Sequence, residues 1–154
     1  SGNLRYATNA GGGWTTETVD DTTNVGQYSD IAVDGSGNVH ISYADGDRFD
    51  LRYATNRSGS WATQLIDAPG SVGPWTSIAV DGAEAVHISY YDGTSGSLKY
   101  VTDQGDVWAR AYLDRRPGGP VGKYGAMTLD SSERLHVSYW NEVYDELTYF
   151  FPQP

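Results

Sequence analysis

A unit of 47 residues is repeated along the chain. The segment LRYATN at Leu4 returns at Leu51, returns as LKYVTD at Leu98 and returns as LTYFFP at Leu147, in steps of 47, 47 and 49 residues. Three tryptophans keep this step: Trp14, Trp61 and Trp108. So do the three histidines of the chain: His40, His87 and His136. The two extra residues of the last step lie between Asp114 and Tyr124. A fixed period whose length changes in one loop indicates a repeat architecture.

Each repeat predicts four short strands. In one repeat they span residues 75–81, 86–92, 98–103 and 108–114, and they are rich in Val, Ile, Tyr, Thr and Trp. Clusters of Gly, Asp, Asn and Ser separate them, which is typical of hairpins. No segment shows a sustained helical period. We therefore expect an all-β fold.

A single meander of this kind cannot bury both of its faces. Alternation along VHISY places Val86, Ile88 and Tyr90 on one face, and His87 and Ser89 on the other. Copies must therefore stack, either radially as a propeller or linearly as a solenoid. Four strands in roughly 40 to 50 residues is the blade size of known propellers. We expect a β-propeller built of four-stranded antiparallel blades.

The strand count predicts about three blades in the chain. The 13 expected strands are two at the start, two full blades, and three at the end. We expect a single propeller domain with blade boundaries near 21–67, 68–114, and 115–154 plus 1–20. Propellers typically have four to eight blades. Two interpretations stay open: the natural protein is longer and further blades complete the ring, or identical chains associate head to tail, so that a dimer has six blades.

The composition narrows the possible partners. Twenty acidic residues against ten basic ones leave a net charge of −10, which disfavours nucleic acids and anionic lipid surfaces. There is no cysteine, so disulfide and thiolate chemistry is excluded. We find no apolar run of ~20 residues for a membrane span and no signal peptide. The chain looks trimmed from a longer repeat protein or processed from a precursor. We expect glycans or proteins as partners, and a secreted, extracellular bacterial setting.

The turn between the third and fourth strands carries a motif. Residues 103–108 have the spacing D-x-G-x-x-W, and residues 9–14 keep it with Asn for Asp. Residues 55–61 preserve the Asn and the Trp but move the glycine by one. The pattern resembles a degenerate Asp-box, or BNR repeat, of sialidase-like propellers. We interpret the motif as structural, because Asx caps its own turn, Gly accepts positive φ and Trp packs beneath the hairpin.

The catalytic residues of sialidases do not carry over to this chain. Sialidases bind the substrate carboxylate with three arginines and carry an Arg-Ile-Pro signature, and no Arg-Ile-Pro occurs here. Arg5, Arg52 and Lys99 share one repeat position, which predicts a repeated strand surface instead of one catalytic centre. We assign no catalytic residue and favour a non-enzyme. A second similarity, of IAVDGSGNVHISY to NHL-type propellers, indicates the same architecture.

The histidines and the Asp-Gly turns keep the period, so we interpret them as structural. Histidine is a common zinc ligand, but equivalent positions in successive blades are too far apart to share an ion. Each is expected to make the same local hydrogen bond, beside the repeated serine of H-x-S-Y. The turn at residues 34–38 could suggest a calcium loop, but its counterparts at 81–85 and 130–134 lack the oxygen ligands. We predict no metal and no cofactor.

Candidate binding residues lie where the repeats vary. Each loop from a fourth to a first strand ends on Val-Gly-x-aromatic and delivers one ring: Tyr28, Trp75 and Tyr124. The loops from second to third strands begin with an acid, and the later two add an aromatic residue: Asp45, Asp92 and Glu142, with Tyr91 and Trp140. Rings flanked by carboxylates suit sugars, because CH-rich sugar faces stack on rings and hydroxyls bond to acids. The alternative is that these rings only pack blade against blade.

These patterns predict a non-catalytic β-propeller binding module. It would recognise glycans or protein partners through equivalent shallow sites on one face, and repetition would raise the avidity. Two alternatives stay open. The chain is a fragment of a sialidase-like or polysaccharide-lyase-like enzyme, in which Tyr and His act as base and acid, or it is a purely structural self-assembling unit. Fold alone separates none of these.

Overall fold

The computed structural model describes residues 2–104 and 107–150, in which every regular element is a β-strand. The strands are β1 (Leu4–Thr8), β2 (Thr15–Asp20), β3 (Val25–Val33), β4 (Val39–Asp45), β5 (Leu51–Thr55), β6 (Ala62–Asp67), β7 (Ser77–Val80), β8 (Val86–Asp92), β9 (Ser97–Thr102), β10 (Ala109–Asp114), β11 (Val121–Leu129), β12 (Leu135–Asn141) and β13 (Glu146–Phe150). The described residues contain no helix that could span a membrane. The expected all-β class and the expected 13 strands are confirmed.

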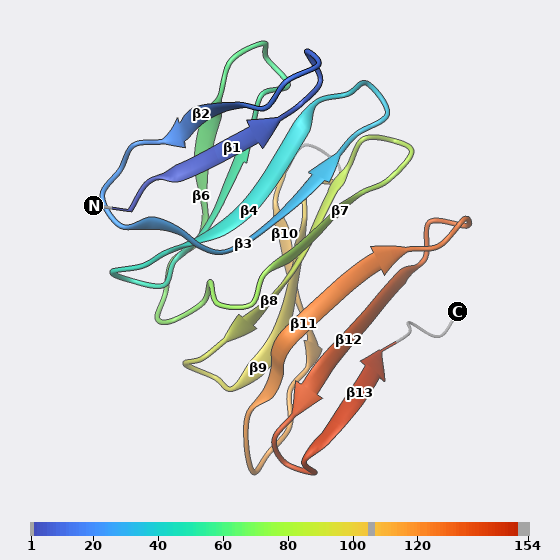
Figure 1. Ribbon diagram of the computed structural model, residues 1–154. Helices are drawn as coiled ribbons and strands as arrows, with labels where there is room; N and C mark the ends of the chain where they lie inside the picture. Colours follow the sequence, from blue (N-terminus) through green and yellow to red (C-terminus); the bar gives the residue numbers. More distant parts are fainter. Residues whose placement is uncertain (1, 105–106, 151–154) are drawn as a thin grey trace.

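The strands form four antiparallel sheets that follow one another along the chain (Figure 1). We name them blade 1 (β1 and β2), blade 2 (β3 to β6), blade 3 (β7 to β10) and blade 4 (β11 to β13). Within each sheet, every strand pairs with the next strand of the sequence. The first strand β7 contacts the first strands β3 and β11 on either side, as the inner strands of successive propeller blades do. The predicted propeller of four-stranded blades is therefore confirmed, with blades 2 and 3 complete.

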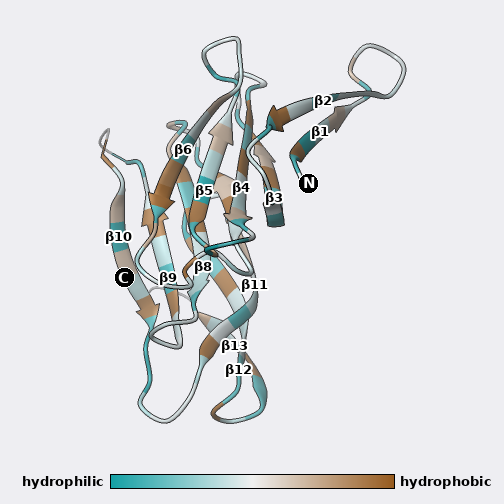
Figure 2. Ribbon diagram, turned by 90° about the vertical axis from the view of Figure 1, so that its left-hand side faces the viewer, coloured by the Kyte–Doolittle hydropathy of each residue, from teal (hydrophilic) through white to brown (hydrophobic). Residues whose placement is uncertain are grey.

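The core of the molecule lies between the blades. Three apolar clusters fill the spaces between blades 1 and 2, 2 and 3, and 3 and 4. At the centre of each is a second-strand tyrosine that is at most 1% exposed: Tyr43, Tyr90 and Tyr139. All seven residues of β8 are buried, so its small polar face lies between blades as completely as its apolar face. Figure 2 shows that hydrophobic residues concentrate in the strands and hydrophilic ones in many of the loops.

One hydrogen bond recurs at every joint between blades. The hydroxyl of the second-strand tyrosine donates to the aspartate that ends the fourth strand of the preceding blade. The O···O distances are 2.6 Å for Tyr43 to Asp20, 2.8 Å for Tyr90 to Asp67, and 2.6 Å for Tyr139 to Asp114. Burial raises the pKa of Tyr90, and the Asp67 carboxylate raises it further. A buried charged hydrogen bond thus ties each blade to the one before it.

A third-strand cation strengthens two of these joints. Arg52 Nε lies 3.5 Å from Asp20, and Lys99 Nζ lies 2.5 Å from Asp67. This explains the repeated position that Arg5, Arg52 and Lys99 share. In blade 4 the corresponding residue is Thr148, which pairs with Tyr139 as Arg52 pairs with Tyr43. Asp114 therefore has no third-strand cation within the described residues, and Arg116 of the following loop pairs with it at 2.9 Å.

The Asp-box hairpins lie between third and fourth strands, as predicted. Gly12 and Gly59 share one repeat position and have φ of 89° and 84°. The motif glycine of the first hairpin is Gly11, one residue earlier, and its φ is not positive, so the prediction for the motif glycine is wrong there. Gly105, at the motif position of the third hairpin, lies outside the described residues. In the second hairpin the Asx side chain bonds outside its own turn, which corrects the prediction there. Asn56 Oδ1 accepts a hydrogen bond of 2.7 Å from the N–H of Val39. Because the third strand ends beside the start of the second, this side chain reaches a backbone donor there.

The Asp-box tryptophans pack on the neighbouring blade. The Trp61 ring lies 5.5 Å from the ring of Tyr6, and the Trp108 ring lies 5.3 Å from that of Tyr53, between centroids. The prediction that each tryptophan packs beneath its own hairpin is therefore wrong. A hairpin at the outer edge of a single sheet offers little apolar surface, whereas the preceding blade offers an aromatic ring.

Removal of the Tyr90 hydroxyl should weaken the joint between blades 2 and 3. We expect Tyr90→Phe to lower the free energy of unfolding by about 1–2 kcal/mol, because Asp67 loses one buried hydrogen bond but keeps Lys99. Urea denaturation followed by fluorescence measures this. Tyr112→Phe, at a ring that is 48% exposed, is the control and should have little effect. Equal stability of the Tyr90→Phe variant and the natural chain would contradict the role of this bond.

Candidate functional site

Two of the three first strands, β3 and β11, are bulged where they begin. In β3 the register to β4 shifts between Val25 and Gln27, and β11 shifts in the same way between Val121 and Lys123. Gly122 has φ of 105°, and a Cβ there would lie 2.7 Å from the Cβ of Leu98. Only glycine fits, so the Val-Gly of the repeated motif encodes the bulge.

The aromatic residue of each Val-Gly-x-aromatic motif has a left-handed backbone. The φ angles are 52° at Tyr28, 53° at Trp75 and 53° at Tyr124. This conformation is an outlier for bulky side chains, and such strain costs about 1–3 kcal/mol per residue. The same strain at three equivalent positions means that the repeat itself specifies it. Strained residues of this kind concentrate at binding sites, where they aim side chains.

The strained residues bring rings from three blades together around Trp75. Its centroid lies 5.4 Å from Tyr28, 5.0 Å from Tyr124 and 5.4 Å from Tyr91. Tyr28 is 42% exposed and Tyr124 is 67% exposed, whereas Tyr91 is buried. The rings therefore pack blade against blade and still present apolar surface to solvent. We call these four residues the aromatic cluster.

A polar pair borders the aromatic cluster. Lys123 Nζ donates a hydrogen bond of 2.6 Å to Glu142 and lies 5.8 Å from the Trp75 ring centroid and 5.6 Å from that of Tyr91. The bond to Glu142 holds the pKa of Lys123 above its usual value. Lys123 is not among the residues predicted from the sequence, although it occupies the variable position of Val-Gly-x-aromatic. Together the pair offers donors and an acceptor beside the rings.

Asp45 and Asp92 end β4 and β8, and their side chains cap the turns that follow. Their Oδ1 atoms accept hydrogen bonds of 2.9 Å from the backbone N–H two residues on. Asn141 makes the same bond at 3.0 Å, so it is their equivalent in blade 4. The predicted alignment of Glu142 with the two aspartates is therefore wrong by one residue. That shift leaves the Glu142 side chain to pair with Lys123.

Trp140 is partly buried next to this region. It holds in blade 4 the strand position that Tyr91 holds in blade 3, and it pairs with Lys123 across β11 and β12. Both lie one residue after a buried second-strand tyrosine. The predicted role of Trp140 in binding stays a prediction.

The histidines lie at the opposite end of the blades, near the turns between first and second strands. Each makes the same two hydrogen bonds, one to a third-strand tyrosine and one to the aspartate of the turn. For His40, Nδ1 lies 2.5 Å from Tyr53 Oη and Nε2 lies 3.1 Å from Asp34. His87 has Tyr100 and Asp81, and His136 has Tyr149 and Asp130. The expected local bond is present, but its partners are Tyr and Asp, while the hydroxyls of Ser42 and Ser89 have no hydrogen-bond partner among the described residues.

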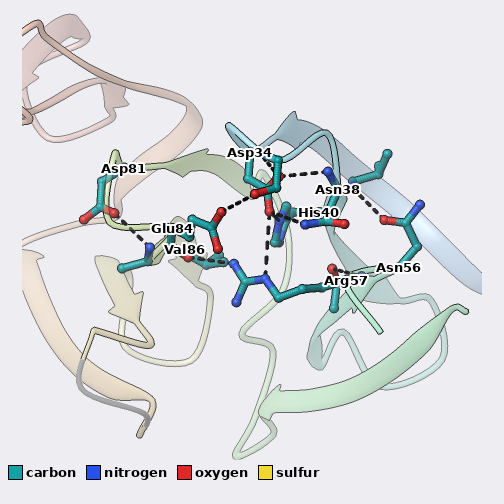
Figure 3. A network of polar contacts seen from close by, with 12 residues as sticks. Asp34, Asn38, His40, Asn56, Arg57, Asp81, Glu84 and Val86 are labelled. Carbon is teal, nitrogen blue, oxygen red and sulfur yellow. Dashed lines mark hydrogen bonds and ion pairs between the residues drawn. The ribbon is translucent and has the colours of Figure 1, made fainter. Parts of the chain in front are cut away.

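The network around Asp34 reaches across to blade 3 (Figure 3). Asp34 accepts hydrogen bonds from Asn38 and His40, while Arg57 joins it at 3.8 Å and donates to the carbonyl of Glu84 at 2.7 Å. Burial alone would raise the pKa of Asp34, but the hydrogen bonds from Asn38 and His40 outweigh it and hold that pKa well below its usual value. Within residues 2–104 and 107–150 there is no group of three side chains that could hold a metal ion.

Comparisons with known proteins show the fold and not the function. No protein-family model and no curated protein matches the chain, so membership of the Asp-box family stays a prediction. The chain is similar to a solved structure of AofleA from Arthrobotrys oligospora, a mutant in which three arginines are replaced by alanine, with a TM-score of 0.66 and 16% identity. That match covers 99% of this chain and 50% of AofleA, so the chain spans about half the length of this neighbour.

Two other solved structures show weaker likeness. One is a fucose lectin from Kordia zhangzhouensis in complex with methyl-fucoside, with a TM-score of 0.47 and 17% identity, over 82% of this chain and 98% of that one. The other is a mutant of NanB sialidase from Streptococcus pneumoniae, with a TM-score of 0.49 and 15% identity, over 94% of this chain and 27% of that one.

Substitution of Tyr124 should reveal the backbone strain. Both Tyr124→Gly and Tyr124→Ala remove the ring, but only glycine accepts φ of 53° without cost. We expect the glycine variant to be more stable than the alanine variant by about 1 kcal/mol, measured by urea denaturation. A normal strand position would show the opposite order, and that order would contradict the strain.

Acid should remove the stability that Asp34 contributes. Its pKa is lowered in the folded protein from about 3.8, so the contribution is complete above that pH and is lost as the pH falls below it. We expect the difference in unfolding free energy between the natural chain and Asp34→Asn to shrink as the pH is lowered from about 6 to below about 3. Asp21→Asn, at an exposed residue, is the control. A difference that does not change with pH would contradict the prediction.

Proposed function

We propose that this chain is a non-catalytic β-propeller module that binds carbohydrate at the aromatic cluster. The observation that carries the proposal is the left-handed backbone of Tyr28, Trp75 and Tyr124. Folding alone gains nothing from a bulky residue in this conformation, since glycine would hold the turn without strain. Aiming rings toward neighbouring blades and solvent accounts for the strain.

The chemistry of the aromatic cluster favours a sugar. Exposed rings of Tyr28 and Tyr124 on either side of Trp75 give a surface on which the CH-rich face of a sugar stacks. Lys123 and Glu142 supply donors and an acceptor for hydroxyls at the border. The site is shallow, so weak affinity per site is expected, and repetition multiplies it. A secreted bacterial setting, where glycans are accessible, belongs to the same proposal.

Two chains joined head to tail would form a ring of six blades. The chain matches 50% of the AofleA length, so two lengths of this chain correspond to one such neighbour. Blade 1 consists of a third and a fourth strand, and blade 4 has no fourth strand among the described residues, so the parts of one four-stranded blade are divided between the two ends of the chain. An unpaired edge is a template for strand addition, and a rotational head-to-tail contact closes into a ring.

A glycan array followed by calorimetric titration tests the binding. We expect Tyr124→Ala to weaken the best glycan ligand about tenfold, because a stacking ring is lost. The ring is 67% exposed, so the fold should survive. Tyr112→Ala is the matched control, since its ring is 48% exposed on the outer strand β10 and should not matter for binding.

No saturable binding to any glycan would overturn the carbohydrate proposal. Binding that Tyr124→Ala leaves unchanged would place the sugar elsewhere and would overturn the assignment of the site. Turnover of a sialoside or a uronate polymer would favour the enzyme alternative.

A further inference from the structure

The two end blades expose complementary halves of the joint that is used inside the molecule. Trp61 packs on Tyr6 and Trp108 packs on Tyr53, each on the blade before its own. Trp14 occupies the same repeat position and is 75% exposed. The next tyrosine in the series is Tyr100 of blade 3, and blade 4 has no described fourth strand to bring it a tryptophan. The Trp14 ring of another copy of the chain fits this position on Tyr100.

The ion pairs between blades are also incomplete at the two ends of the chain. Asp20 and Asp67 each meet a third-strand cation, but Asp114 has Thr148 at that position and pairs with Arg116 of its own loop instead. Arg5 holds the cation position of the third strand in blade 1. Its guanidinium donates to the exposed Thr16 hydroxyl at 2.8 Å. Arg5 is thus the third-strand cation that the Asp114 joint lacks.

The aromatic cluster is open on both sides. The rings run in the order Tyr28, Trp75, Tyr124 along successive blades, with contacts of 5.4 and 5.0 Å. A further blade beside blade 4 would bring its own strand-entry ring against Tyr124. If blades 1 and 2 of another copy follow, that ring is Tyr28.

Strand β13 has no following blade to cover it. Leu4, Leu51 and Leu98 lie at the start of their third strands, in the clusters shared with the next blade, at 4%, 0% and 0% exposure, whereas Leu147 is 74% exposed. Strand β13 is the third strand of blade 4, as β1 is the third strand of blade 1. The 13 strands therefore include four third strands, whereas three complete blades need only three.

We propose that a second copy of the chain completes blade 4 by strand exchange. The β1–β2 hairpin of the second copy replaces β13, so that blade 4 becomes β11, β12, β1 and β2. Trp14 then packs on Tyr100, Arg5 reaches Asp114, and Tyr28 packs on Tyr124. Two such exchanges close a ring of six blades. The last contact completes the aromatic cluster and rests on the proposed function, whereas the strand exchange does not.

The register of the exchanged strand follows from the complete blades. In blade 2, Ile41 of the second strand pairs with Ala54 of the third. The corresponding residues are Val137 in β12 and Ala7 in β1, which lie in the last and first blades of one chain (Figure 1). At present Val137 pairs with Phe150 of β13. A covalent link between Ala7 and Val137 therefore reports exchange between two copies.

Disulfide crosslinking tests the exchange. The chain has no cysteine, so the double variant Ala7→Cys, Val137→Cys has no background. After mild oxidation we expect a covalent dimer of twice the 16.8 kDa chain mass on non-reducing gels, with each single variant as control. Light scattering should give the same doubled mass for the natural chain. A mass of 16.8 kDa, or a dimer that does not crosslink, would overturn the proposal.

A second pair of cysteines fixes the alternative arrangement, in which β13 stays paired with β12 of its own chain. Val137→Cys with Phe150→Cys should hold β13 in place within one chain and leave the protein monomeric after oxidation, with the dimer restored on reduction. A dimer that persists in the oxidised variant would overturn the exchange.

Trp14→Ala tests the joint without disturbing the core. We expect at least about tenfold weaker dimerisation, because a ring that packs across the joint is lost, although it is exposed in the single chain. Leu65→Ala, at a residue 49% exposed on β6, is the matched control. Dimerisation that is unchanged in Trp14→Ala would contradict the packing on Tyr100. Glycan binding is measured separately, so crosslinking without binding overturns only the proposed function, and binding without crosslinking overturns only the exchange.

Discussion

The hydrogen bond from a buried second-strand tyrosine to the last aspartate of the preceding blade sets the relation between neighbouring blades. It joins the inner half of one sheet to the outermost strand of another, so it forms only when the blades are correctly stacked. Asp67 would be costly to bury alone, but Tyr90 and Lys99 satisfy it together. The stack then buries both faces of β8, which no single meander could do.

The aromatic cluster depends on that stacking. Rings from β3, β11 and the entry to β7 meet at about 5 Å only because the blades that carry them are packed together. The backbone strain at Tyr28, Trp75 and Tyr124 is offset by the buried joints between the blades. The histidine networks lie at one end of the strands, and the aromatic cluster lies at the other end.

The period of 47 residues was sufficient to predict the strands, their order and the propeller class, because every element recurs at the same step. Predictions failed where a side chain crosses between blades. Trp61 was expected beneath its own hairpin and lies on Tyr6 instead. Glu142 was aligned with Asp45 and Asp92, although Asn141 is their equivalent. Lys123 was missed, since a residue at a variable position gains its meaning from the rings it contacts.

By itself the sequence determined what is local: strand alternation, the turn residues, the glycine of the bulge and the aromatic residue after it, because these depend on neighbours along the chain. Only the tertiary structure decided which rings touch, which carboxylates are satisfied by cations, and which residues of the repeat stay exposed. Those properties depend on the contact of one blade with another, and equal repeats do not have equal neighbours. Trp14 and Trp108 keep one period, yet Trp108 has an aromatic partner in the preceding blade and Trp14 is 75% exposed.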